Sequence, residues 1–89
     1  MKNESSPIIA TKAQLIKKKK DVHTHTDANG AMSMSETLYL FYQLDTGSQI
    51  KLTVKAGIYQ NAPEHEWGVL TFQGTRFLKF ESRFGVLER

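Results

Sequence analysis

The sequence contains no cysteine, which excludes disulfide bonds, thiolate metal sites and a cysteine nucleophile. No apolar run approaches the roughly 18 to 20 residues of a membrane-spanning helix, so none is present within these 89 residues. A chain of this length forms one domain at most, and its hydrophobic core is thin because a small domain buries a smaller share of its surface.

The motifs of common catalytic sites are also missing. No glycine-rich phosphate loop is present, and neither Ser33 nor Ser35 has the flanking glycines of a nucleophile elbow. The segment Glu64-His65-Glu66 contains an acid/base set, but neighbouring residues of an extended loop point in different directions and need not converge. The sequence therefore predicts a protein that is not an enzyme and has no cofactor.

The net charge of +3 arises entirely in the N-terminal third of the chain. Residues 1–30 hold six lysines and three acidic residues, whereas residues 31–89 hold six basic and six acidic residues. Most of the excess lies in Lys17-Lys18-Lys19-Lys20. Such a run is typical of a solvated strand that is protected against edge-to-edge aggregation, but it can also attract the phosphates of lipids or nucleic acids. Nucleic acid is the less favoured partner, because no arginine or aromatic residue is interleaved with the lysines.

Apolar residues alternate with polar ones in several segments, as in β-strands. Turn-forming residues separate these segments at Asp27–Gly30, Asp45–Ser48 and Gln73-Gly74. A helical turn or compact loop is expected over 57–62, and a helix remains an alternative for the first segment. The expected strands cover 8–22, 34–44, 49–55, 68–72 and 76–81, and the tail is expected to add a short edge strand.

Close hairpins between these strands predict an all-β fold. Both faces of 34–44 are substantially apolar, which favours a small antiparallel barrel or half-open barrel of five to six strands over a flat sheet. The helical turn or loop lies between the third and fourth strands. We expect a flexible leader over 1–7, one barrel-like domain over 8–84 and a tail over 85–89.

Aromatic residues make up 10% of the chain and are expected mainly in the core, with a partner groove or a base-stacking platform as alternatives. Trp67 is expected to cover one end of the barrel, since Gly68 beside it permits close backbone approach. The nine residues are Tyr39, Phe41, Tyr42, Tyr59, Trp67, Phe72, Phe77, Phe80 and Phe84.

The register of the last hairpin is ambiguous. A two-residue turn at Gln73-Gly74 would place Leu70 and Phe72 on a different face from Leu78 and Phe80. We predict instead a longer loop or a bulge at Gly74, which brings all four apolar side chains to the core face.

His23 and His25 are the leading candidate metal ligands. They share one face of a strand, where both imidazoles could contact one ion, and Asp21 and Asp27 share that parity and could add oxygen ligands. His65 could join them only if its loop folds back. Two histidines near a flexible turn are also an ordinary feature of a polar strand end, and we predict no metal site.

The C-terminal half resembles a known family. Lys51–Lys55, Tyr59 and Gly68–Glu81 are similar to the small bacterial proteins of domain-of-unknown-function family 2500, and the most specific piece is Gly74-Thr75-Arg76-Phe77. The loop Glu64–Trp67 departs from the family pattern. The family has no assigned activity, so the resemblance supplies no catalytic residues.

The resemblance implies a single-span membrane protein with an N-terminal helix ahead of a small β domain. We therefore expect this chain to be the soluble part of a longer product, anchored in the cell membrane by a helix outside it, on a side that is not predicted. The expected role is in protein interaction or assembly, as a monomer or weak homodimer. A nucleic-acid-binding barrel that uses Lys17–Lys20 is the alternative. Arg76 is expected to pair with Glu81, Glu66 or Asp45, and a ligand carboxylate or phosphate is the alternative partner.

Overall fold

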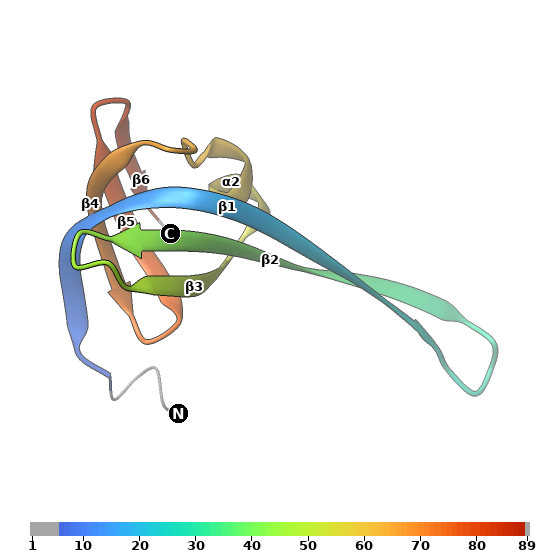
Figure 1. Cartoon of the computed structure of the whole chain (residues 1–89). Helices are drawn as coiled ribbons and strands as arrows, with labels where there is room; N and C mark the ends of the chain where they lie inside the picture. The colour runs from blue at the N-terminus through green and yellow to red at the C-terminus, as the bar shows by residue number, and fades with distance from the viewer. Residues whose placement is uncertain (1–5, 89) are drawn as a thin grey trace.

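The computed structural model describes residues 6–88, which form six strands and one short helix (Figure 1). The predicted all-β fold, with a helical turn between the third and fourth strands, is confirmed. The elements are β1 (Ile8–Thr26), β2 (Met32–Leu44), β3 (Gln49–Val54), α2 (Ala56–Asn61), β4 (Trp67–Gln73), β5 (Arg76–Ser82) and β6 (Gly85–Glu88).

Strand β1 belongs to two parts of the sheet at once. Its first seven residues, Ile8–Gln14, pair with β4, and its residues from Ala13 to the end pair with β2. The two ladders overlap at Ala13 and Gln14, and a bulge at Ile16 then interrupts the β1–β2 ladder. A bulge of this kind bends a strand and increases its twist. One continuous strand of 19 residues therefore forms the link between the two halves of the domain.

Five strands form a ring in the order β3-β2-β1-β4-β5, which the pairing of β3 with β5 closes, and β6 is added to the ring by pairing with β5. All neighbouring pairs are antiparallel except β3 and β5, which meet in parallel at one residue pair, Thr53 and Arg76. The backbone N–H of Thr53 donates to the carbonyl oxygen of Thr75 at 3.2 Å across this contact. We call this contact the seam, since it closes the ring with far fewer hydrogen bonds than the other pairings.

The core fills the ring with alternate residues of each strand. Leu38, Leu40 and Tyr42 of β2 are buried, as is Leu52 of β3. Ile58 and Ala62 of the helical segment cover one side of this cluster. Six side chains are almost wholly enclosed: Leu15, Leu40, Tyr42, Leu52, Leu70 and Phe80.

The expected aromatic core is confirmed only in part. Tyr42, Phe72, Phe77 and Phe80 are buried, whereas Trp67 is 47% exposed and does not cover an end of the ring. Phe84 is also exposed, and three further rings are half-buried: Tyr39, Phe41 and Tyr59.

The β4–β5 hairpin has a bulge, but at a different residue from the one predicted. Gly74 and Thr75 form the turn, with Gly74 at φ 60°, and the bulge lies at Leu78. Leu70 faces Phe80, as expected. Because the turn is tight, Phe72 faces Phe77 rather than Leu78, and Phe77 is buried in place of Leu78. The bulge then shifts the alternation of side chains by one residue, so that Phe80 points into the core.

Gly68 is needed where β4 crosses over the core. A Cβ built on Gly68 would collide with the backbone oxygen of Glu81 and would lie 2.7 Å from the ring of Phe80. The expected close backbone approach at this glycine is confirmed. Because a backbone oxygen and a buried ring cannot move independently, any side chain here displaces β4 from β5.

We predict that Gly68→Ala lowers the free energy of unfolding by roughly 1 to 3 kcal/mol, as overpacking does in well-packed cores. The matched control is Gly57→Ala, since a Cβ at Gly57 meets no atom within 4 Å and alanine favours a helix. Urea unfolding of both variants measures the difference. Equal stability of the two variants would contradict the packing account.

Tyr42 is fully buried and packs against Phe80 with ring centroids 5.4 Å apart. Its hydroxyl makes no hydrogen bond with any residue of the described chain. Burial raises the pKa of the Tyr42 hydroxyl, because desolvation disfavours the phenolate. The side chain contributes apolar area and ring packing, while its hydroxyl opposes folding.

We predict that Tyr42→Phe raises the free energy of unfolding by about 1 kcal/mol at neutral pH, since it removes a buried polar group without a partner. The wild-type protein should lose stability above about pH 10, where the unfolded chain ionises this tyrosine and the folded chain does not. Tyr42→Phe should reduce that loss, and the control Tyr39→Phe should retain it. A Tyr42→Phe variant less stable than wild type in thermal unfolding would contradict this assignment.

Candidate functional site: the projecting arm

The outer parts of β1 and β2 form a two-stranded arm, defined here as residues 21–37. Figure 1 shows this ribbon extending away from the other strands. The molecule is 49 Å long with a radius of gyration of 15.0 Å, whereas a compact chain of this length has a radius of about 12 Å. The arm accounts for this elongation.

Both edges of the arm are open within the described chain. On β1 the pairing with β4 ends at Gln14, and on β2 the pairing with β3 covers only Leu38–Gln43. The backbone along Met32–Thr37 therefore has no neighbouring strand on its outer side among residues 6–88. An unpaired edge of this kind is a template for another strand.

The tip of the arm is held by Asp27. Its carboxylate accepts hydrogen bonds from the backbone N–H groups of Asn29 at 2.9 Å and Ala31 at 3.0 Å. Gly30 takes the left-handed conformation, with φ 83°, and its N–H donates to the Asp27 carbonyl. The predicted turn is thus present, and these bonds fix the position at which the chain reverses.

The arm has two chemically different faces, because residues paired across the ribbon share a face. One face carries Val22, Met32 and Met34, which are 49%, 72% and 69% exposed, together with Thr24, Thr26 and the single acidic residue Glu36, which lies opposite Val22. We call it the apolar face. The opposite, polar face carries Asp21, His23, His25, Ser33, Ser35 and Thr37.

The histidines do not assemble with His65. His23 and His25 lie on the polar face opposite Ser35 and Ser33. The backbone of His65 is tied to the start of β1, since its N–H donates to the Leu15 carbonyl at 2.6 Å. At about 3.3 Å per residue, Leu15 and His23 are some 26 Å apart along the strand. Residues 6–88 contain no cluster of three candidate metal ligands.

The other titratable residues around His65 are also dispersed. Glu66 pairs with Arg83 at 3.1 Å, and the carbonyl of His65 accepts a hydrogen bond from the Gln14 amide. His65 itself has φ 62°. The loop therefore docks onto β1 and the β5–β6 hairpin, and no contact within residues 6–88 joins the side chains of Glu64, His65 and Glu66.

The lysine run lies at the base of the arm. The bulge at Ile16 places Lys17 and Lys19 beside Phe41 and Tyr39 on the outer face of the ring, and Lys18 and Lys20 on the other face. These lysines stand on the open edge of β1, the setting in which charge discourages aggregation.

Aromatic rings accompany these lysines in space, although not in sequence. The Lys17 ammonium lies 5.7 Å from the centroid of the Phe41 ring, and Lys51 on β3 lies 4.7 Å from that of Tyr39. On the opposite face Lys18 lies 5.5 Å from the Tyr59 ring. The interleaving of cations and aromatic groups that the sequence lacked is therefore produced by strand pairing.

Arg76 does not make the expected ion pair. Lys79 contacts Glu81 at 3.5 Å, Arg83 contacts Glu66, and Asp45 accepts a hydrogen bond from Thr11. The three expected acids are thus engaged elsewhere, and within the described chain no acid contacts Arg76.

The other residues of the segment Gly74-Thr75-Arg76-Phe77 contribute to the fold. Gly74 and Thr75 make the turn, the Thr75 carbonyl accepts the hydrogen bond of the seam, and Phe77 is buried. The motif therefore builds the hairpin that closes the ring.

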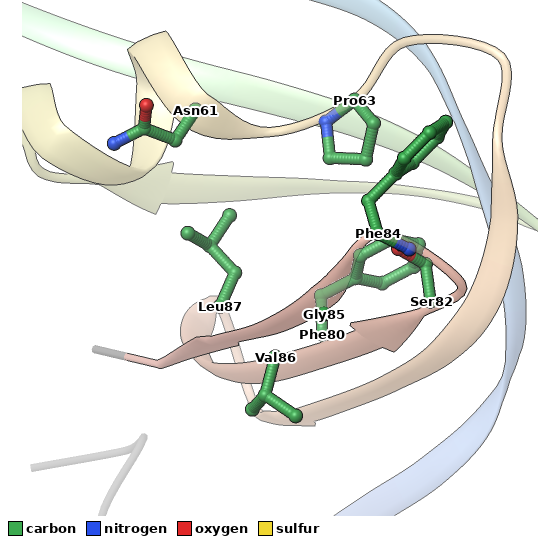
Figure 2. A pocket seen from close by; sticks show the side chains of 8 residues that line it. All are labelled: Asn61, Pro63, Phe80, Ser82, Phe84, Gly85, Val86 and Leu87. Atoms are coloured by element: carbon green, nitrogen blue, oxygen red, sulfur yellow. The ribbon is translucent and has the colours of Figure 1, made fainter.

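A hollow of about 180 Å³ lies between the end of α2 and the β5–β6 hairpin. Figure 2 shows Phe84 and Leu87 of the hairpin on one side and Asn61 and Pro63 on the other. Among residues 6–88 no charged side chain lines it, and the Asn61 amide donates to the Gly57 carbonyl. The described lining therefore offers a ligand mainly apolar contact.

No helix among residues 6–88 has the length and apolar character needed to cross a bilayer. The apolar face of the arm was not identified from the sequence. Met32 and Met34 alternate with Ser33 and Ser35 in the sequence, which indicates a strand with one apolar face. This alternation does not reveal whether other parts of the chain cover that face.

Comparison with known proteins places the chain among proteins without an assigned activity. A family described as "Protein of unknown function (DUF2500)" matches residues 1–81. A crystal structure of a Proteus penneri protein from a structural genomics consortium is similar in fold, with a TM-score of 0.72 and 22% sequence identity. The similarity covers 88% of this chain and 98% of that one. No curated protein matches.

Proposed function

Since the chain belongs to the DUF2500 family of proteins of unknown function, we propose that it is a non-enzymatic interaction module of a membrane-anchored bacterial protein, and that a protein partner docks on its arm. The observation that carries the proposal is the arm itself. It presents an open strand edge beside three exposed apolar side chains.

The two edges of the arm differ in charge. The open edge of β1 begins with Lys17–Lys20. These lysines repel a basic strand, so a partner on this edge would need negative charge. The open segment Met32–Thr37 of β2 has one charged residue, Glu36. A partner strand adds most readily along this second edge, where main-chain hydrogen bonds supply affinity and alternate side chains supply specificity.

Burial of the apolar face favours such a complex. Full burial of a methionine or valine side chain is worth roughly 1.5 to 3 kcal/mol, and Val22, Met32 and Met34 are each about half or more exposed. A two-stranded ribbon is also only marginally stable in water. A partner that covers the apolar face therefore gains binding energy from the burial and also stabilises the two-stranded arm.

The membrane attachment is a proposal that rests on the resemblance described above. Lys17–Lys20 are compatible with it, because each lysine near an anionic lipid surface contributes about 1 kcal/mol of attraction. In this arrangement the domain is held at the cell membrane as a monomer or weak homodimer, with the arm available to its partner.

We predict that a photo-crosslinking residue at position 22 of the full-length gene product joins the partner in intact cells. The double variant Met32→Lys/Met34→Lys should reduce this crosslink at least tenfold, because it places positive charge on the apolar face. The matched control, Ser33→Lys/Ser35→Lys, adds the same charge to the polar face of the same strand and should keep the crosslink. Equal loss in both variants, or no crosslink specific to the arm, would refute docking on the apolar face.

Single-stranded nucleic acid is the second candidate, favoured by the lysine and aromatic pairs on the outer face. A complex that neutralises about four phosphates should weaken about 50-fold between 50 and 200 mM salt. Fluorescence anisotropy with a random oligonucleotide measures this. Tight binding that depends on Lys17, Lys19 and Lys51 would favour this candidate over protein docking.

A further inference from the structure

A second hollow lies where the seam ends. Strands β3 and β5 touch at one residue pair and then separate, since β3 ends at Val54 and the chain turns into α2. The gap has a volume of about 250 Å³. It is lined by Thr53, Val54, Lys55, Ile58, Arg76 and Phe77, none of which belongs to the arm.

The rim of this hollow is positively charged, and no acidic side chain of residues 6–88 neutralises it. Arg76 and Lys55 both line it, and within residues 6–88 neither side chain makes an ion pair. Arg76 is also half-buried. A guanidinium that is partly withdrawn from water without a carboxylate gains from an anion that accepts its parallel N–H groups.

The floor of the hollow is apolar. Ile58 and Phe77 are buried, with 8% and 2% of their surface exposed, and Val54 is half-buried. An apolar floor beneath a cationic rim is complementary to a molecule with one anionic end and an apolar body. Inorganic phosphate would satisfy the rim but would bring no surface to cover the floor.

We propose that this hollow binds a carboxylate with a short apolar body. The Arg76 guanidinium receives the carboxylate in a two-pronged contact, and Lys55 adds a second positive charge. The apolar body lies on Val54, Ile58 and Phe77. At about 30 Å³ for each water-sized group, the hollow accommodates roughly eight non-hydrogen atoms, which is the size of a medium-chain acid or of one terminal residue of a peptide.

The test titrates the 89-residue chain with acetate, butanoate, hexanoate and octanoate, and follows the backbone amides of Val54, Ile58 and Phe77 by NMR. Affinity should rise about fourfold for each added methylene until the hollow is filled, as burial of a CH₂ group predicts. Hexanamide, which lacks the charge, should bind at least tenfold more weakly than hexanoate. Inorganic phosphate should bind more weakly than hexanoate.

Arg76→Gln should weaken hexanoate binding at least tenfold, and Arg76→Lys should restore part of it. The matched control is Arg83→Gln, because Arg83 is paired with Glu66 and does not line this hollow. Circular dichroism establishes that each variant is folded. If Arg76→Gln does not fold, Lys55→Gln provides the second variant, with an expected loss of about threefold.

Two sources of the carboxylate are compared directly. A tetrapeptide that ends in leucine is tested with a free and with an amidated C-terminus, beside free hexanoate. Tighter binding of the free-terminus peptide identifies a protein C-terminus as the ligand, and tighter binding of hexanoate identifies a free acid. Binding that is independent of chain length, equal for phosphate and hexanoate, or unchanged in both Arg76→Gln and Lys55→Gln would overturn the proposal.

Discussion

The length of β1 is the constraint on which the rest of this structure depends. Nineteen residues at about 3.3 Å each span some 60 Å, which exceeds the 29 Å and 22 Å of the two shorter dimensions of the molecule. Such a strand cannot remain within the wall of a small ring. Its first part therefore pairs with β4, its middle part carries core residues, and its last part projects with β2 as the arm.

The same constraint separates the stable part of the molecule from the part available to partners. Ala13 of β1 pairs with both β2 and β4, and Leu15 faces the core. Both residues are fully buried. Beyond Asp21 the ribbon has no layer beneath it in the described chain, and its apolar residues remain exposed. A monomer gains nothing from an exposed apolar face, so we interpret this one as an interaction surface.

Strands and turns were predictable here because they depend on local patterns. The alternation within 34–44 identified a strand, and Asn29-Gly30 identified a reversal of the chain. A bulge in the last hairpin was predicted, but its position at Leu78 was not, nor was the bulge at Ile16. Each of these residues directly follows another apolar residue, and only pairing with another strand decides which of the two is displaced.

The surfaces depended on tertiary contacts and were therefore harder to predict. Lys17 and Phe41 are 24 positions apart in the sequence but meet across the β1–β2 ladder. Arg76 was expected to have an acidic partner among three candidates. Two of these acids contact other cations, and the third accepts a hydrogen bond from Thr11. The projection of the arm follows from where β3 and β4 end, which no local pattern within residues 21–37 encodes.

The most direct test of this account is to remove the arm. Asp21 and Thr37 face each other across the ribbon, so replacing residues 22–36 by Asn-Gly joins them through a two-residue hairpin turn. The account predicts cooperative thermal unfolding with a midpoint within about 5 °C of the intact chain, equivalent to roughly 1 kcal/mol in a domain of this size. Loss of cooperative unfolding, or a midpoint lowered by more than about 15 °C, would show that the arm is part of the folding unit and would contradict its assignment as an interaction surface.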